Sequence, residues 1–140
     1  QRLDRRDEGQ PRFTPAPVAH GRLVARFLAA AERGDVQALA ETLAQDVVTV
    51  SDGGGKVHAA RRPIVGREAV LRFFSGLLRL APPNTRFTRA EVNGEPAILT
   101  WTGESLINVV TFEVADGLVQ NIRIVVNPDK LAYIQRQRSQ

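Results

Sequence analysis

The segment from residue 85 to residue 126 restricts the fold more than any other part of the chain. TRFTRAEV and AILTWT flank the turn Val92-Asn93-Gly94-Glu95, and LINVVTFEV and LVQNIRIVV flank Ala115-Asp116-Gly117. Asn-Gly and Asp-Gly are typical of tight β-hairpins, because these residues accept the positive φ that such turns require. This part of the chain is therefore predicted to form an antiparallel meander of four strands.

Helical periodicity precedes the meander. Apolar residues spaced i, i+3, i+4 and i+7 predict one buried helical face at Val24, Phe27, Leu28 and Ala31. We expect Gly34 to end this helix and Asp35 to cap a second one. VVTV (47–50) then predicts a strand that returns through VHAARRPIV, and a third helix is expected from Gly66 to Pro82-Pro83. The order predicts an α+β fold with helices on one face of a curved sheet, enclosing a conical pocket.

The glycine run in SDGGGKVHAARRPIVG (51–66) invites comparison with a phosphate-binding loop. A P-loop would need glycine where Val50 stands and a hydroxyl where Val57 stands. The spacing therefore excludes a P-loop and favours a wide hairpin turn. Asp52 is expected to start this turn, and a general base at the mouth of the pocket is the alternative role for its carboxylate.

One polar residue interrupts an apolar row on the fifth predicted strand. Alternation puts one set of side chains on a single face, namely Leu106, Asn108, Val110, Phe112 and Val114. A buried amide needs hydrogen-bond partners, so Asn108 is expected either to contact a neighbour or to face a ligand. Trp101 is expected to fill the core or to form a wall of the pocket.

Composition excludes several classes of protein. The chain of 140 residues has no cysteine and two histidines, which argues against disulfides and a metal site, and no cofactor is predicted. Its charge of +4 comes mostly from arginine without aromatic interleaving, so a solvated face is favoured over a nucleic-acid surface. The absence of a membrane span or signal peptide favours the cytoplasm, and the absence of methionine favours a fragment of a longer protein.

Three segments resemble the SnoaL-like branch of the NTF2-like superfamily, namely RFLAAAERGDVQALAETLAQDVVTVSDGG, RRPIVGREAVLRFF and VTFEVADGLVQNIRIVVNPDKL. The resemblance implies an NTF2-like cone with about three helices. In the ketosteroid isomerases of this branch, the base would correspond to Asp52, the tyrosine donor to Phe27 and the acid donor to Asn108. Isomerase activity is therefore doubtful, since losing an oxyanion donor costs about 3 kcal/mol of barrier. The predicted pocket residues are Phe27, Asp52, Trp101, Asn108 and Phe112.

The segments DGGGK and NPDKL indicate a narrower group within this branch. With AARRPIVG, they resemble a SnoaL-like domain joined to one group of extracytoplasmic-function sigma factors. The resemblance implies docking on sigma regions 2 and 4 of the same chain, contact with core RNA polymerase, and promoter DNA bound by upstream domains. The expected contact residues are Asp52, Gly53, Gly54, Gly55, Lys56, Asn127, Pro128, Asp129 and Lys130.

Domain bounds follow from the same resemblance. Residues 1–17 would be a linker or the end of sigma region 4, 18–131 the SnoaL-like domain, and 132–140 a polar tail. A small apolar ligand and a homodimer of the isolated domain are further options. The alternative function is a stand-alone small-molecule enzyme or binding protein, with Asp52 as its catalytic residue.

Overall fold

The computed structural model describes residues 16–53, 62–126, 131–132 and 134–136, and its elements follow the predicted order. The helices are α1 (Ala16–Arg33), α2 (Val36–Ala40) and α3 (Arg67–Leu80). The strands are β1 (Leu43–Asp52), β2 (Ile64–Val65), β3 (Thr85–Val92), β4 (Glu95–Thr102), β5 (Ser105–Ala115) and β6 (Leu118–Val125). The predicted α+β class is confirmed.

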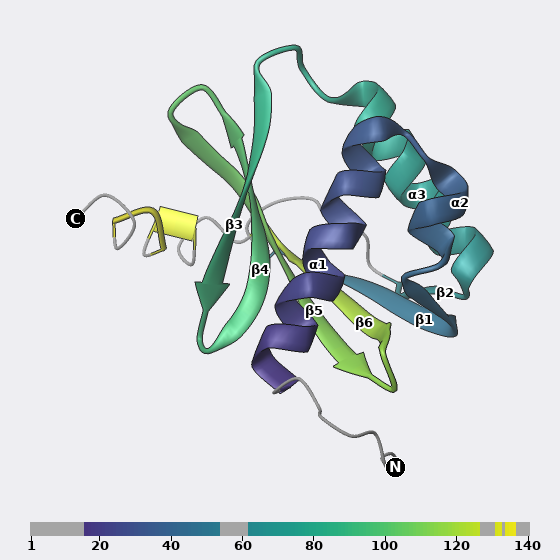
Figure 1. Ribbon diagram of the computed structural model, residues 1–140. Helices are drawn as coiled ribbons and strands as arrows, with labels where there is room; N and C mark the ends of the chain where they lie inside the picture. Colours follow the sequence, from purple (N-terminus) through teal and green to yellow (C-terminus); the bar gives the residue numbers. More distant parts are fainter. Residues whose placement is uncertain (1–15, 54–61, 127–130, 133, 137–140) are drawn as a thin grey trace.

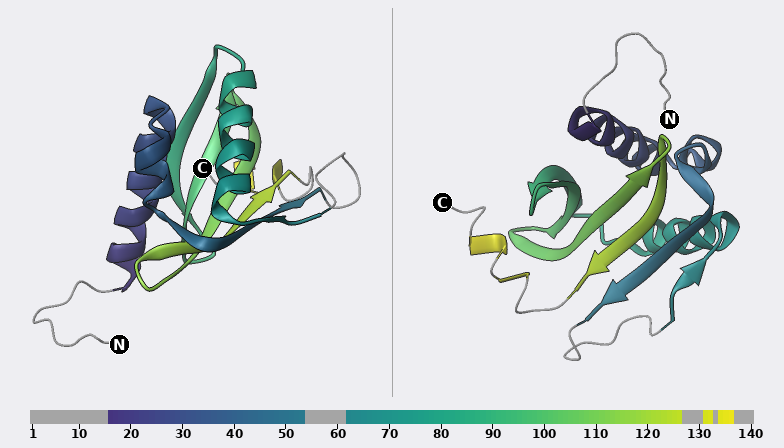
Figure 2. Two further views of the ribbon diagram at one scale, coloured as in Figure 1. Left: turned by 90° about the vertical axis from the view of Figure 1, so that its right-hand side faces the viewer. Right: turned by 90° about the horizontal axis from the view of Figure 1, so that it is seen from below.

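The strands form one six-stranded mixed sheet in the order β2-β1-β6-β5-β4-β3. β1 runs parallel to β6, whereas every other neighbouring pair is antiparallel. The sheet curves, and the three helices lie on one side of it (Figure 1; Figure 2, right). The meander is therefore extended at its β6 edge by the two strands that come from the first half of the chain.

Both predicted hairpin turns have the expected backbone. Asn93 and Gly94 have φ values of 52° and 79°, and Asp116 and Gly117 have 56° and 73°. Two successive positive φ values match the twist of the flanking strands, which is why Asn-Gly and Asp-Gly suit these positions. The β3–β4 and β5–β6 hairpins are confirmed, with Val92 opposite Glu95 and Ala115 opposite Leu118.

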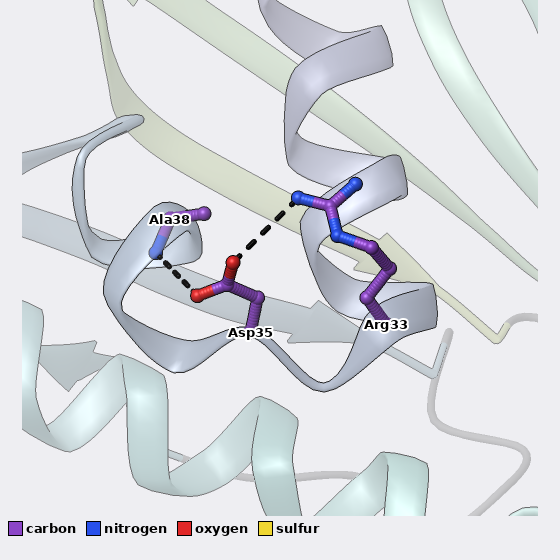
Figure 3. A network of polar contacts seen from close by, with 3 residues as sticks. All are labelled: Arg33, Asp35 and Ala38. Atoms are coloured by element: carbon purple, nitrogen blue, oxygen red, sulfur yellow. Dashed lines mark hydrogen bonds and ion pairs between the residues drawn. The ribbon is translucent and has the colours of Figure 1, made fainter.

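A glycine and an aspartate separate α1 from α2, as the sequence predicts. Gly34 has a φ of 69°, and the Oδ1 atom of Asp35 accepts a hydrogen bond of 3.0 Å from the backbone N–H of Ala38 (Figure 3). The other carboxylate oxygen of Asp35 lies 3.7 Å from Arg33 Nη2. Because this ion pair is solvent-exposed, the capping bond is the main local reason that α2 begins here.

Two apolar clusters pack on opposite faces of the sheet. The inner cluster joins the helices to the sheet and includes Val24, Phe27, Val47, Phe74 and Ile122. The outer cluster consists of Ala97, Leu99, Leu106, Val109 and Val125, with Leu131 and Ile134 packed against it. Leu131 and Ile134, which follow β6 in the sequence, therefore cover part of the sheet face opposite the helices.

Two buried threonines differ in their hydrogen bonding. Thr42 and Thr49 are each 1% exposed. Thr42 Oγ1 donates a hydrogen bond of 2.7 Å to the carbonyl of Leu39, whereas Thr49 Oγ1 has no partner among the residues described. The unpaired hydroxyl is a cost to the folded state, because it loses its bonds to water.

Replacing these threonines by valine should therefore change stability in opposite directions. Thr49→Val removes the unpaired hydroxyl and should raise the unfolding free energy by about 1 kcal/mol, or the melting temperature by roughly 3–5 °C. Thr42→Val removes a made bond and should lower stability by a similar amount. Thermal denaturation of the two variants in parallel tests this, and a loss of stability in Thr49→Val would contradict it.

Candidate functional site

A cavity of about 270 Å³ lies between the helices and the inner face of β3, β4, β5 and β6. Its wall is built mainly from apolar side chains of α1, α3 and the sheet, together with threonines and one asparagine. None of the described residues that line it is charged. The lining residues are Phe27, Leu28, Ala31, Phe74, Leu77, Leu78, Leu80, Ala81, Pro82, Thr85, Phe87, Ile98, Thr100, Thr102, Ile107, Asn108, Val110 and Ile124.

Two of the lining residues each have a buried polar atom without a hydrogen-bond partner among the described residues. These atoms are Asn108 Oδ1 on β5 and Thr85 Oγ1 at the start of β3. Buried polar atoms are normally paired, so each unpaired one calls for an explanation. The sequence singled out Asn108 but not Thr85, although the alternation in TRFTRAEV already placed Thr85 on the same face as Phe87.

Phe27 lines the cavity and packs against two other aromatic rings. Its ring centroid lies 5.6 Å from that of Phe74 and 5.0 Å from that of Phe112, both in edge-to-face arrangements. Phe27 lines the cavity, whereas Phe112 is packed in the inner cluster and is not among the lining residues. Phe27 has no hydroxyl, so it cannot supply the donor that a tyrosine would give at this position.

A β-bulge changes the face that part of β5 presents. Thr100 pairs with Asn108 and Trp101 pairs with Leu106, which leaves Ile107 as an extra residue. The bulge shifts the alternation by one residue, so Leu106 belongs to the outer cluster and does not share a face with Asn108. The predicted row of five side chains on one face is therefore wrong at Leu106. Ile107 lies at the rim of the cavity instead.

Trp101 lies on the outer face of the sheet and does not form a wall of this cavity. Its ring packs against the outer cluster, and its indole Nε1 donates a hydrogen bond of 2.9 Å to Thr88 Oγ1. Arg86 Cζ lies 4.9 Å from the ring centroid, within the range of a cation–π contact. The placement of Trp101 in the pocket is corrected accordingly, because β4 directs Thr100 and Thr102 inward and Trp101 outward.

Asp52 ends β1 at the same edge of the sheet as the end of β6. It is partly exposed, pairs in register with Val125, and its carbonyl accepts a hydrogen bond of 2.8 Å from the backbone N–H of Val126. It is not among the residues that line the cavity. The described structure therefore brings Phe27 and Asn108 together but does not bring Asp52 to them.

The segments DGGGK and NPDKL follow β1 and β6, and the two strands end at this shared edge. Gly53, which is buried, follows Asp52 directly, and Val126 follows β6. The other predicted contact residues lie outside the described residues, namely Gly54, Gly55, Lys56, Asn127, Pro128, Asp129 and Lys130. The structure shows that the two strand ends that lead into these segments, at Asp52 and Val126, lie side by side.

The described residues offer neither a metal-binding cluster nor a membrane-spanning helix. Within the described ranges, no group of three or more His, Cys, Asp or Glu side chains is placed to hold a metal ion. None of the described helices is long and apolar enough to cross a membrane.

The sequence profile of the SnoaL-like domain matches residues 24–122. The chain belongs to the SnoaL-like domain family. The match extends from the middle of α1 into β6 and includes every described residue of the cavity wall except Ile124. The predicted resemblance to this family is confirmed.

The SnoaL-like domain is also similar to part of a larger protein. It is 31% identical over 122 residues to the ECF RNA polymerase sigma factor SigJ of Mycobacterium tuberculosis, covering 80% of this chain and 39% of SigJ. The crystal structure of SigJ superimposes with a TM-score of 0.67 at 30% identity, over 80% of this chain and 43% of that one. The chain therefore spans about two fifths of the length of this relative.

Solved structures of single domains support the fold alone. An NTF2-like protein of unknown function from Mesorhizobium loti has a TM-score of 0.59 at 20% identity, with 83% of this chain and 97% of that chain covered. The expected NTF2-like cone, with a curved mixed sheet packed on helices, is confirmed.

Proposed function

We infer that this SnoaL-like domain regulates a bacterial extracytoplasmic-function sigma factor to which it is joined, by docking on sigma regions 2 and 4 of the same chain. Similarity to SigJ supports the sigma-factor context. In this proposal residues 1–17 lead from the upstream regions, 18–131 form the domain, and 132–140 follow it. Core RNA polymerase is a further partner, the upstream domains bind promoter DNA, and the protein acts in the cytoplasm.

The observation that carries the proposal is the common edge at which DGGGK and NPDKL begin. Asp52 and Val125 pair in parallel register, and the hydrogen bond from Val126 to Asp52 joins the two strand ends. Two segments that are distant in sequence therefore start side by side. Segments that start together can contribute to one contact surface, with glycine permitting close backbone approach and Lys56, Asp129 and Lys130 supplying charge.

The alternative, an isomerase-like or cyclase-like enzyme, receives no comparable support. Among the described residues, no carboxylate lines the cavity, and Phe27 brings no hydroxyl to it. Asp52, the base that such a reaction would use, is located at the strand end and not in the lining. The cavity lining and the position of Asp52 therefore give this alternative less support than the docking role has.

A transcription assay with the full-length sigma protein tests the docking role. Lys56→Ala should change reporter output by about twofold to fivefold, because a charged contact at an interface rim contributes roughly 0.5–1 kcal/mol. Its melting temperature should stay within about 1 °C of the unchanged protein, because in this proposal Lys56 contributes to docking and not to the core of the domain.

Arg72→Ala is the matched control, since Arg72 is an exposed cation on α3, outside the shared edge. It should transcribe like the unchanged protein. The docking role is wrong if Lys56→Ala, together with a glycine-loop variant such as Gly54→Pro, also transcribes like the unchanged protein while remaining folded.

A further inference from the structure

Beyond docking, we propose that the end of the chain covers an interface on the outer face of the sheet, and that its release lets this face pair with a second copy of the chain. The covering residues are 131–132 and 134–136, called the strap from here on. Leu131 and Ile134 of the strap pack on the outer cluster, on the side of the sheet opposite the helices. The proposal concerns this face alone and does not rest on the proposed contact with sigma regions.

The strap turns one side toward the sheet. Its residues have helical backbone, and Leu131, Ile134 and Gln135 are spaced i, i+3 and i+4, which puts side chains on one helical face. All three contact the sheet, the first two by packing and Gln135 by hydrogen bonds. Ala132 and Arg136 fall outside this spacing and are exposed. The strap is therefore amphipathic and docks through its apolar side.

Gln135 bonds to the sheet where β5 extends past its neighbour. Val109 is the first residue of β5 that pairs with β6, so residues 105–108 lie beyond the end of that pairing. Gln135 Oε1 accepts a hydrogen bond of 3.2 Å from the backbone N–H of Leu106, and its Nε2 donates one of 3.0 Å to the carbonyl of Glu104. One side chain thus supplies both a donor and an acceptor to this end of β5.

The face beneath the strap is shielded from water. Leu99 and Val109 belong to the outer cluster and are 0% and 1% exposed, although α1, α2 and α3 all lie on the other side of the sheet (Figure 1). The partly buried side chains that pack on this cluster include Leu131 and Ile134. Releasing the strap therefore exposes apolar area, and contiguous apolar area on a protein surface is a typical site of association.

A second copy of the chain is the partner that fits this face. The buried members of the outer cluster come from three strands and are all aliphatic, namely Ala97, Leu99, Leu106, Val109 and Val125. Sheet faces of this kind pack on one another at about 10 Å, and a two-fold axis lets the same residues serve both copies. Because no member of the cluster is charged, pairing the face with itself brings no like charges together within it.

The strap blocks this pairing twice, since both copies must release it before their faces meet. Apparent affinity falls in proportion to the fraction of molecules in the competent state, and this fraction enters once for each copy. A tenfold rise in the released fraction should therefore strengthen dimer formation by about a hundredfold. We expect the unchanged chain to be monomeric for this reason.

Ile134→Asp should release the strap in the full chain, because a carboxylate is strongly disfavoured against an apolar face. Analytical ultracentrifugation over a series of concentrations should give the monomer mass of 15.4 kDa for the unchanged chain and twice that mass for the variant. Val36→Asp makes the same chemical change at a residue of α2 that is 50% exposed, and it should stay monomeric. A folded but monomeric Ile134→Asp, or a dimeric unchanged chain, would overturn the proposal.

Gln135→Ala gives a milder test that keeps both aliphatic side chains of the strap, so it decides the matter where Ile134→Asp does not fold. Losing the two hydrogen bonds to β5 and to the turn before it should raise the released fraction about threefold to tenfold, and dimer affinity about tenfold to a hundredfold. Arg136→Ala changes the exposed neighbour and should leave affinity within about twofold. A folded Gln135→Ala that self-associates no more than the unchanged chain would contradict the role of the strap.

Trp101 identifies the face that is used. It is the single tryptophan of the chain, and it packs against the outer cluster. In Ile134→Asp its fluorescence maximum should move to shorter wavelength as concentration rises, because pairing buries the ring, whereas the unchanged chain should show no such dependence. Dimer formation without this shift would place the interface elsewhere and refute the assignment. The transcription assay reads the docking segments and not this face, so the two proposals fail independently.

Discussion

Phe27→Ala should lower the unfolding free energy by about 3–5 kcal/mol, the usual cost of truncating a buried phenylalanine. Phe27 is 3% exposed and its ring contacts Phe74 on α3 and Phe112 on β5. A single side chain of α1 thus contacts both helix α3 and the sheet within the inner cluster. Because a domain is stabilised by only about 5–15 kcal/mol, urea denaturation should show a large fall in midpoint.

Two controls separate the ring contacts from general damage to α1. Phe27→Leu keeps most of the buried volume and should lose less than about half as much stability as the alanine variant. Val18→Ala changes a side chain on α1 that is 47% exposed, and it should alter stability by less than about 0.5 kcal/mol. A Phe27→Ala midpoint close to that of Val18→Ala would contradict the central position of this ring.

Gly66→Ala should destabilise the domain by about 1–3 kcal/mol through backbone strain alone. Gly66 precedes α3 with φ 99° and ψ 146°, a conformation that residues with a Cβ rarely adopt. A Cβ built at this position would meet nothing within 4 Å, so crowding does not contribute. The backbone N–H of Gly66 also donates a hydrogen bond of 2.8 Å to the carbonyl of Val47, and this bond holds the conformation. Thermal denaturation measures the effect.

Gly21→Ala is the matched control, with the opposite expected sign. Gly21 lies within α1, and an added Cβ there also meets nothing within 4 Å. Alanine is favoured over glycine inside a helix by roughly 0.5–1 kcal/mol, so this variant should be more stable than the unchanged chain. A change of the same sign at both glycines would show that backbone conformation does not decide the outcome.

The order of elements could be predicted because each local signal agrees with the fold. The apolar period changes from helical to alternating near Val47, and the turn residues Asn93-Gly94 and Asp116-Gly117 fix both hairpins. Gly34 and Asp35 mark the α1–α2 junction in the same direct way. These features depend on residues that are neighbours in sequence, which is why the chain alone reveals them.

The composition of the cavity wall could be predicted only in part. Asn108 stands out as a polar residue in an apolar row, and the structure places it in the lining. The bulge at Ile107 is invisible to alternation, because one extra residue reverses the faces of everything beyond it. Leu106 therefore belongs to the outer face, although a regular strand would place it with Asn108.

The end of the chain shows a second limit of local reasoning. Residues 132–140 look like a polar tail, yet Ile134 packs on the outer cluster. Gln135 accepts a hydrogen bond of 3.2 Å from the Leu106 N–H and donates one of 3.0 Å to the carbonyl of Glu104. These contacts join residues about thirty positions apart, and a short apolar stretch followed by polar residues gives no periodic signal that would reveal them.

The parallel pairing of β1 with β6 also has a mechanical consequence. A partner that holds both DGGGK and NPDKL would pull the two strands in the same direction, so tension would not slide one strand past the other. A partner that holds only one segment would pull its strand lengthwise along its neighbour. That load falls on the evenly spaced hydrogen bonds from Val48–Asn121 to Asp52–Val125 together, which resist sliding far better than bonds that open one at a time. A pull on either segment at this edge would therefore load these hydrogen bonds together and not one at a time.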